Sequence, residues 1–283
     1  MPNLNFPLRP LVDVAWLAAN KSNSALIIVE SKMKPVNASD DWESGWKILD
    51  AVQMDINADF SILDTDLPHM MPSEEYFTSA AQTIGINKDS VIVVYDQVGT
   101  YGSPRAWWMF KAMGHEHVYV LNGGFLAWEK AGFKKEKANW PKVGKGNFEA
   151  TLDKNLFYKS NDVLDIIDNS NFQIMDARSQ GRFDGTSTEP RAGLRGGHIP
   201  NSVCLPFQAV QEGIYMKSKV ELQAIFKEFQ LKNKSLVMTC GSGVTASVIA
   251  LAAEIAGYKN AAVYDGSWAE WGMPEEWPVS KAN

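Results

Sequence analysis

Cys240 is the residue whose neighbours in the sequence best suit covalent chemistry. It ends an apolar run, Ser235-Leu-Val-Met-Thr-Cys240, and is followed at once by Gly241-Ser-Gly-Val-Thr-Ala246. The run predicts a short buried strand, the small residues predict a tight loop, and residues 244–255 predict an apolar helix closed by Gly257. The N–H groups of residues 241–246 would converge in front of this helix, where an anion is stabilised. A thiolate there would be a nucleophile.

The alternative for Cys240 is an inert thiol that packs as a small apolar residue. The Gly-Ser-Gly sequence after it favours the anion site, because plain packing does not need such residues. Cys204, in Asn201-Ser-Val-Cys-Leu-Pro206, is expected to be a buried strand residue and not a second catalytic thiol. The two cysteines and four histidines form no recognisable metal-binding pattern, so we expect neither a metal nor another cofactor.

Residues 176–200 are expected to form a long loop rich in Gly and Pro. Long loops inside a compact domain are usually functional, and a guanidinium group suits a carboxylate because it donates two parallel hydrogen bonds. For any single arginine here, and for Arg178 and Arg195 above all, a solvated charge or an internal ion pair with Asp184 or Glu189 is the alternative. The four arginines of this loop are Arg178, Arg182, Arg191 and Arg195.

The sequence repeats itself. Ser90-Val-Ile-Val-Val-Tyr-Asp96 matches the run that ends at Cys240, and Leu26-Ile-Ile-Val-Glu30 matches Phe172-Gln-Ile-Met-Asp176. Strands that alternate with helices in this way predict an α/β protein. We expect two tandem domains, each a mainly parallel sheet with helices on both faces.

The expected domains are residues 1–140 and 158–283, joined by a linker at 141–157 that is rich in Lys, Gly and Asn. Asp96 takes the position of Cys240 in the first copy. The first domain is therefore expected to be non-catalytic.

Composition narrows the class of partner. The chain has 283 residues, a net charge of -6 and a pI near 5.3, which argues against binding to nucleic acid or to an anionic membrane surface. No stretch is long and apolar enough to predict a membrane span. The first residues show neither a signal peptide nor a transit segment, so we expect a cytoplasmic location.

Several motifs together resemble one family. They are Leu67-Pro-His-Met-Met-Pro72, Ser103-Pro-Arg-Ala-Trp-Trp108, Gly197-His-Ile-Pro200 and Cys240-Gly-Ser-Gly-Val-Thr-Ala246. With these motifs the chain resembles the tandem-domain rhodanese-like sulfurtransferases over nearly its whole length. The resemblance implies that Cys240 takes sulfur from a small-molecule donor as a persulfide. The acceptor would be a thiol, such as thioredoxin or glutathione, or cyanide.

The resemblance also implies residue roles. Arg182 and Arg191 would hold the donor's carboxylate and carbonyl, and Ser242 would join a proton relay with His69. Asn57 stands where the family has the acidic member of that relay, and Asp55 is its possible substitute. The loop amides that would hold the sulfur are those of Gly241, Gly243, Val244 and Thr245.

The neutral residues after Cys240 bear on the donor. In the family, such a loop belongs to enzymes that take 3-mercaptopyruvate and release pyruvate, whereas thiosulfate-specific relatives carry basic residues there. A thiosulfate sulfurtransferase is thus one alternative, and a non-enzymatic module that binds sulfur carriers is another. A cysteine phosphatase would need Arg at position 246, which is Ala246.

Overall fold

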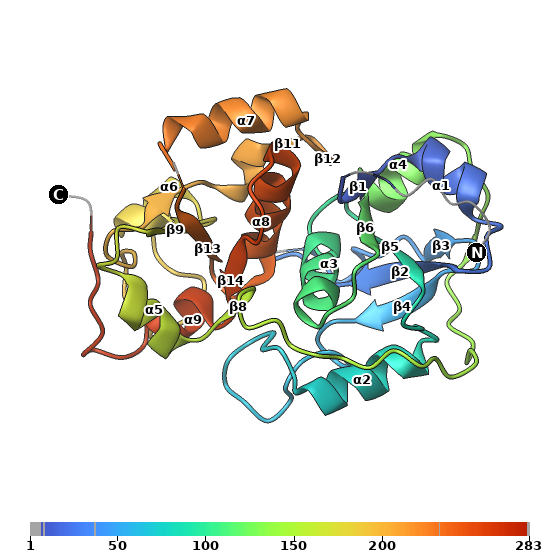
Figure 1. Cartoon of the computed structure of the whole chain (residues 1–283), viewed down its shortest axis with the longest axis horizontal. Coiled ribbons are helices and arrows are strands. Elements are labelled where there is room, and N and C mark those ends of the chain that lie inside the picture. The colour runs from blue at the N-terminus through green and yellow to red at the C-terminus, as the bar shows by residue number, and fades with distance from the viewer. Residues whose placement is uncertain (1–6, 8, 37, 232, 282–283) are drawn as a thin grey trace. The chain divides into compact units, whose positions relative to one another are not determined.

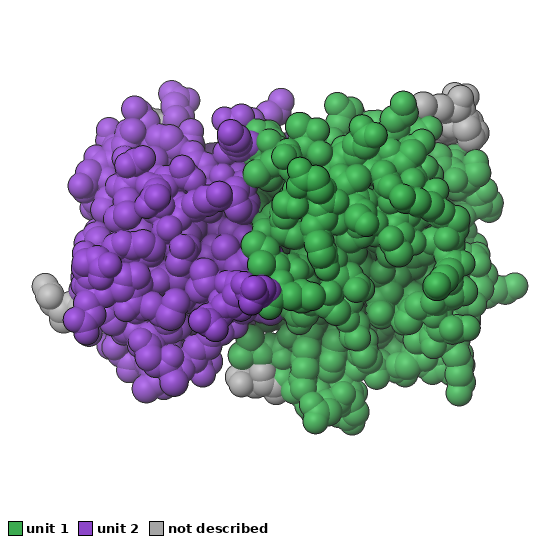
Figure 2. Space-filling view, turned by 90° about the horizontal axis from the view of Figure 1, so that it is seen from below, with its two compact units in different colours: residues 1–63, 71–153, 213–216 green, residues 64–70, 154–212, 217–283 purple. Residues whose placement is uncertain are grey.

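The computed structural model describes residues 7, 9–36, 38–231 and 233–281, and the chain divides into two compact units (Figure 1). Unit 1 comprises residues 1–63, 71–153 and 213–216; unit 2 comprises residues 64–70, 154–212 and 217–283. Figure 2 colours the residues of the two units separately. Within the described ranges, no helix is long and apolar enough to cross a membrane.

Unit 1 is an α/β unit whose five-stranded sheet has the order β1-β6-β5-β2-β4, with all neighbours parallel. Two further strands, β3 and β7, pair in antiparallel fashion. The elements of unit 1 are β1 (Leu11–Val12), α1 (Val14–Asn20), β2 (Leu26–Lys32), β3 (Trp46–Ile48), β4 (Val52–Asp55), α2 (Glu74–Thr83), β5 (Val91–Tyr95), α3 (Ser103–Ala112), β6 (Val118–Leu121), α4 (Gly124–Lys130) and β7 (Lys135–Lys137), with β12 (Tyr215–Met216) contributed from later in the chain.

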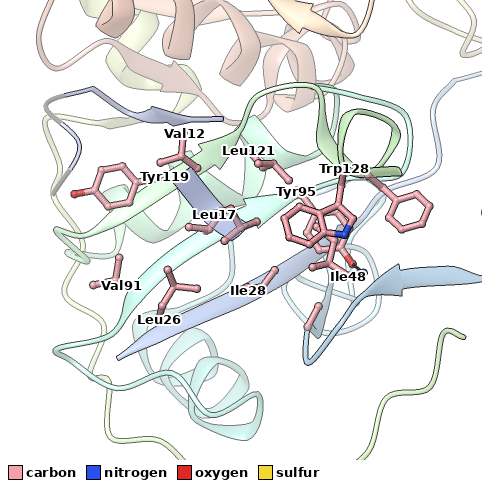
Figure 3. Packing of buried hydrophobic residues seen from close by; sticks show 13 residues of the cluster. Val12, Leu17, Leu26, Ile28, Ile48, Val91, Tyr95, Tyr119, Leu121 and Trp128 are labelled. Atoms are coloured by element: carbon pink, nitrogen blue, oxygen red, sulfur yellow. Dashed lines mark hydrogen bonds between the residues drawn. The ribbon is translucent and has the colours of Figure 1, made fainter. Parts of the chain in front are cut away.

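The sheet of unit 1 is covered on both faces. Every residue of the central strand β5 is buried, as expected for a parallel strand between two helical layers. On one face, Leu17 of α1 and Trp128 of α4 join the apolar cluster that Figure 3 shows with Ile28 of β2. Helix α3 packs against β2, β5 and β6. These layers hold the carboxyl end of β5, and with it Asp96, in a fixed place.

Unit 2 has a five-stranded sheet of order β10-β9-β13-β14-β8, again with all neighbours parallel. Its buried cluster includes Ile174, Val237, Trp268 and Trp271, and α8 packs against β13, β14 and α7. The elements are β8 (Phe157–Tyr158), α5 (Ser160–Ile166), β9 (Phe172–Asp176), α6 (Gln180–Asp184), β10 (Val203–Cys204), the 3₁₀ turn η1 (Phe207–Val210), β11 (Gln211–Glu212), α7 (Lys219–Glu228), β13 (Ser235–Thr239), α8 (Val244–Ala256), β14 (Ala262–Tyr264) and α9 (Ser267–Trp271).

The two sheets have the same strand order once matching strands are paired. In unit 1 the order is β1-β6-β5-β2-β4, and the strands at the same places in unit 2 are β8, β14, β13, β9 and β10. The duplicated α/β fold predicted from the sequence is confirmed. Strand β5 matches β13, so Asp96 and Cys240 follow equivalent strands.

Part of the predicted linker is bound to unit 1. The N–H of Gly146 donates to the carbonyl of Gln82 at 2.8 Å, and the N–H of Thr151 donates to Met113 at 3.0 Å. Later in the chain, the N–H of Met216 donates to Asn122 at 2.9 Å, which fastens residues 213–216 to the same unit.

Asp96 fills the anion position of unit 1 with its own carboxylate. Its Oδ2 accepts from the N–H groups of Tyr101, Gly102 and Ser103 at 2.8, 3.0 and 2.9 Å, and from the Ser103 hydroxyl at 2.7 Å. Its Oδ1 accepts from the N–H of Val98 at 3.0 Å. These donors lie at the start of α3, whose first residue is Ser103 and whose N-cap is Gly102.

Substitution of this carboxylate should destabilise unit 1. In Asp96→Asn the amide group places an N–H₂ donor against backbone donors, and the charge is lost, so we expect the free energy of unfolding of this unit to fall by about 2 kcal/mol or more. Urea unfolding measures the loss. Asp89→Asn, at an exposed position, makes the same change of charge and should leave the urea concentration at the midpoint of unfolding unchanged. Equal transitions for the two variants would contradict this account of Asp96.

Candidate active site

Cys240 lies between the end of β13 and the start of α8, as the sequence predicts. The residue is 1% exposed, and the N–H of Ser242 points to its Sγ at 3.5 Å. Helix α8 begins after Gly243, and no side chain caps its N-terminus. Because the first N–H groups of a helix have no partner within it, those of α8 remain available to an anion at the sulfur.

Ser267, which the sequence analysis did not single out, organises the cysteine loop. Its Oγ accepts from the N–H groups of Cys240 at 3.2 Å and Gly243 at 3.0 Å, and donates to the carbonyl of Tyr264 at 2.8 Å. The next residue, Trp268, donates its N–H to the carbonyl of Cys240 at 2.9 Å. The start of α9 therefore fixes the backbone on both sides of the sulfur.

The repeat offers a signal that could have found Ser267. In unit 1 the N–H of Phe125 donates to the carbonyl of Asp96 at 2.9 Å, as Trp268 does to Cys240, so Gly124 is the counterpart of Ser267. Both residues have positive φ, 55° for Gly124 and 51° for Ser267. Glycine adopts this conformation freely and serine rarely does, so a serine there carries a strain that its three hydrogen bonds offset.

Arg182 and Arg191 converge on the residue after Cys240. A Cβ atom placed on Gly241 would lie 3.2 Å from Nη2 of Arg182 and 3.9 Å from Nη1 of Arg191. A side chain at position 241 would fill the space that the two guanidinium groups face. The structure thus brings two cations to the loop that holds the thiol, and glycine keeps the approach open.

Arg178 is structural. Its side chain is 0% exposed, pairs with Asp176 at 2.6 Å and with Glu189 at 2.8 Å, and stacks over the ring of Trp268 at 4.1 Å. Burial disfavours the charged guanidinium, but the two carboxylates outweigh it and raise the pKa of Arg178. The alternative of an internal ion pair with Glu189 is confirmed for this arginine.

Arg195 binds backbone instead of a carboxylate. Its guanidinium donates to the carbonyls of Gly272 at 3.2 Å, Trp271 at 3.1 Å and Trp277 at 2.9 Å. It holds the C-terminal segment on unit 2 and takes no part in the pair over Gly241. Residues 176–200 are also not a continuous loop, because Gln180–Asp184 form α6 and Arg182 projects from its last turn.

Cys204 is unsuited to nucleophilic chemistry at neutral pH. It is half-buried at the end of β10, and its Sγ lies 3.6 Å from the carbonyl oxygen of Arg178. Burial, helped by the charges of Asp176 and Asp184, raises the pKa of this thiol to about 12. Cys204 therefore stays protonated and unreactive.

The other predicted residues are placed as follows. Ser242 is buried beside the sulfur in the cysteine loop, and His69 lies in residues 64–70, a segment that groups with unit 2, the unit of Cys240. His69 has a φ of 62°, in the left-handed region. Asp55 of unit 1 pairs with Lys32 at 3.0 Å, and Asn57 is exposed.

Among the residues that the structure describes, no cluster of His, Cys, Asp and Glu could hold a metal ion.

Comparison with known proteins agrees with the duplicated fold. The model of the rhodanese-like domain matches residues 13–131 and again residues 160–273. The chain belongs to the rhodanese-like family. It is a tandem-domain sulfurtransferase of the mercaptopyruvate and thiosulfate sulfurtransferase type.

Its relatives include proteins named for either donor. The chain is 36% identical over 275 residues to the 3-mercaptopyruvate sulfurtransferase of Escherichia coli, covering 95% of this chain and 96% of that protein. It is 43% identical over 206 residues to the thiosulfate sulfurtransferase of Gallus gallus, covering 71% and 70%. The crystal structure of the 3-mercaptopyruvate sulfotransferase SseA from Escherichia coli superposes with a TM-score of 0.81 at 33% identity, covering 93% of this chain and all of that one. Sequence similarity alone therefore leaves the donor open.

Removal of the Ser267 hydroxyl should impair sulfur transfer. Without it, the N–H groups of Cys240 and Gly243 lose their common acceptor, the loop shifts, and kcat/KM for the sulfur donor should fall by about tenfold to a hundredfold. Steady-state assays of Ser267→Ala measure this. Ser247→Ala is the matched control, because its buried hydroxyl donates to the carbonyl of Gly243 at 3.0 Å. Equal activities of the two variants would contradict the role given to Ser267.

Proposed function

We propose that this sulfurtransferase takes its sulfur from 3-mercaptopyruvate, passes it through a persulfide on Cys240 and releases pyruvate. The observation that carries the proposal is the convergence of Arg182 and Arg191 over Gly241, beside the buried thiol. Two guanidinium forks at this distance suit the carboxylate and the adjacent carbonyl of a 2-oxo acid. Binding there would present the donor's sulfur to Cys240, which is catalysis by positioning.

In the proposed first half-reaction, the Cys240 thiolate attacks the sulfur of the donor. An S–S bond forms, the C–S bond of the donor breaks, and its electron pair goes to carbon as the enolate of pyruvate. The proton of the donor's thiol moves to that carbon, so the products are pyruvate and a persulfide anion on Cys240. The arginine pair would stabilise the enolate, and the free N–H groups at the start of α8 would hold the persulfide. By family resemblance, Ser242 and His69 would carry the proton.

In the second half-reaction, an acceptor thiolate attacks the outer sulfur. The S–S bond of the persulfide breaks, its electron pair returns to Cys240 as thiolate, and the acceptor leaves as its own persulfide. Cyanide would leave as thiocyanate by the same step. We propose a low-molecular-weight thiol such as glutathione, or a protein dithiol such as thioredoxin, as the acceptor.

Thiosulfate is the competing donor, because a named thiosulfate sulfurtransferase is 43% identical to this chain. Thiosulfate carries two negative charges, and a site for it gains from cations beside the sulfur. The residues that follow Cys240 here, Gly241 and Ser242, are neutral. This loop favours the singly charged carboxylate.

Donor kinetics tests the proposal. With one common acceptor, wild type should show a higher kcat/KM for 3-mercaptopyruvate than for thiosulfate, and Cys240→Ser should lose about a thousandfold or more with both. Cys204→Ser is the control thiol and should retain the activity. A preference of the wild type for thiosulfate would overturn the donor assignment. Activity that survives in Cys240→Ser would overturn the nucleophile, and inactivity of wild type with both donors would favour a sulfur-carrier binding module.

A further inference from the structure

Glu189 is shared by the guanidinium groups of Arg178 and Arg182. Its side chain is 1% exposed. Its Oε1 accepts from Nη1 of Arg178 at 2.8 Å, and its Oε2 accepts from Nη2 and Nε of Arg182 at 2.5 and 3.1 Å. A bidentate contact of this kind fixes both the direction and the plane of the Arg182 guanidinium. Arg182 is held from behind while its side chain remains 23% exposed.

The formal charges of the two arginines and the two carboxylates in this network cancel. Arg178 and Arg182 contribute two positive charges, and Asp176 and Glu189, which are paired with them, contribute two negative charges. Arg191 forms no ion pair or hydrogen bond with the residues that the structure describes. Apart from the sulfur of Cys240, whose charge is the same for either donor, the cluster that faces the space above Gly241 thus has a net charge of one positive unit, contributed by Arg191.

We propose that Glu189 is a specificity-determining residue: its buried negative charge limits the donor site to one net positive charge, which matches a singly charged carboxylate and disfavours a dianion. The inference rests on the proposed function, since it concerns the choice between donors at the same site. Glu189 acts on the donor in two ways: it positions Arg182, and its carboxylate charge contributes to the electrostatic field at the donor site.

The physical reason is that the energy of a ligand in the field of one added charge scales with the ligand's own charge. Loss of the Glu189 charge raises the net charge of the cluster from one to two. A dianion gains about twice as much from this change as a monoanion does. A looser Arg182 would also change the ratio of the two kcat/KM values, because this arginine is assigned to the carboxylate of 3-mercaptopyruvate. A variant that restores the net charge while Arg182 stays loose separates the two effects.

The test is the ratio of kcat/KM for thiosulfate to kcat/KM for 3-mercaptopyruvate in Glu189→Gln, which keeps the size of the side chain. We expect the ratio to rise about tenfold over wild type. Arg191→Gln removes the unpaired cation and should lower the ratio. The double variant Glu189→Gln/Arg191→Gln restores the net charge and should return the ratio towards the wild-type value.

Glu228→Gln, an exposed position on α7, makes the same change of one charge and should leave the ratio unchanged. An unchanged ratio in a folded Glu189→Gln, or a double variant that departs further from wild type than either single variant, would overturn the inference. Should Glu189→Gln fail to fold, a ratio in Arg191→Gln that does not fall would overturn it as well.

Whether the wild type prefers 3-mercaptopyruvate or thiosulfate is a separate result from the change in the ratio on substitution. A wild type that prefers thiosulfate refutes the proposed donor but leaves the direction of the shift measurable. Binding of pyruvate, a monoanion, and of sulfate, a dianion that accepts no sulfur, reports the same ratio without turnover when it is measured calorimetrically on the enzyme without donor. A Glu189→Gln protein whose ratio of affinities does not move towards sulfate would contradict the inference, whichever donor the wild type prefers.

Discussion

Backbone N–H groups that gather between a buried strand and the following helix must meet an anion, and both units are built around this constraint. In unit 1 the anion is the carboxylate of Asp96, which accepts from four backbone N–H groups and one hydroxyl. In unit 2 the equivalent residue is Cys240, and α8 begins without a side-chain cap. A carboxylate satisfies the site permanently, whereas a thiol leaves it open to a thiolate or a persulfide. One architecture therefore holds a carboxylate in one unit and a thiol in the other.

The residues around the cysteine loop form two supports that meet at Trp268. Ser267 and the N–H of Trp268 hold the backbone of Cys240 from the start of α9. The indole ring of Trp268 lies under the guanidinium of Arg178, which shares Glu189 with Arg182. The cysteine loop and Arg182 are thus positioned by the same buried layer, so the distance between the thiol and this guanidinium is set by the core of unit 2. The proposed reaction depends on this fixed distance more than on any single contact.

The sequence was most informative where local patterns decide the structure. The apolar run before Cys240 and the helix closed by Gly257 formed as predicted, because burial and the left-handed C-cap at Gly257 are local demands. The repeat predicted two equivalent sheets, and matching strand orders confirm it. Long-range pairing was not predictable, because it depends on how segments far apart in the chain are packed. Examples are the sharing of Glu189 between two arginines, the binding of Arg195 to distant carbonyls, and the grouping of residues 64–70 with unit 2. Helix α6 was missed because its five residues, Gln180–Asp184, show no apolar periodicity.

The central claim is that Cys240 carries the transferred sulfur. Its most direct test is the mass of the protein after incubation with 3-mercaptopyruvate in the absence of an acceptor, followed by peptide mapping. The account predicts a gain of one sulfur atom on the peptide that contains Cys240, its absence in Cys240→Ser, and its loss when a thiol acceptor is added. Sulfur found on the Cys204 peptide, or turnover with no sulfur on any cysteine, would contradict the account.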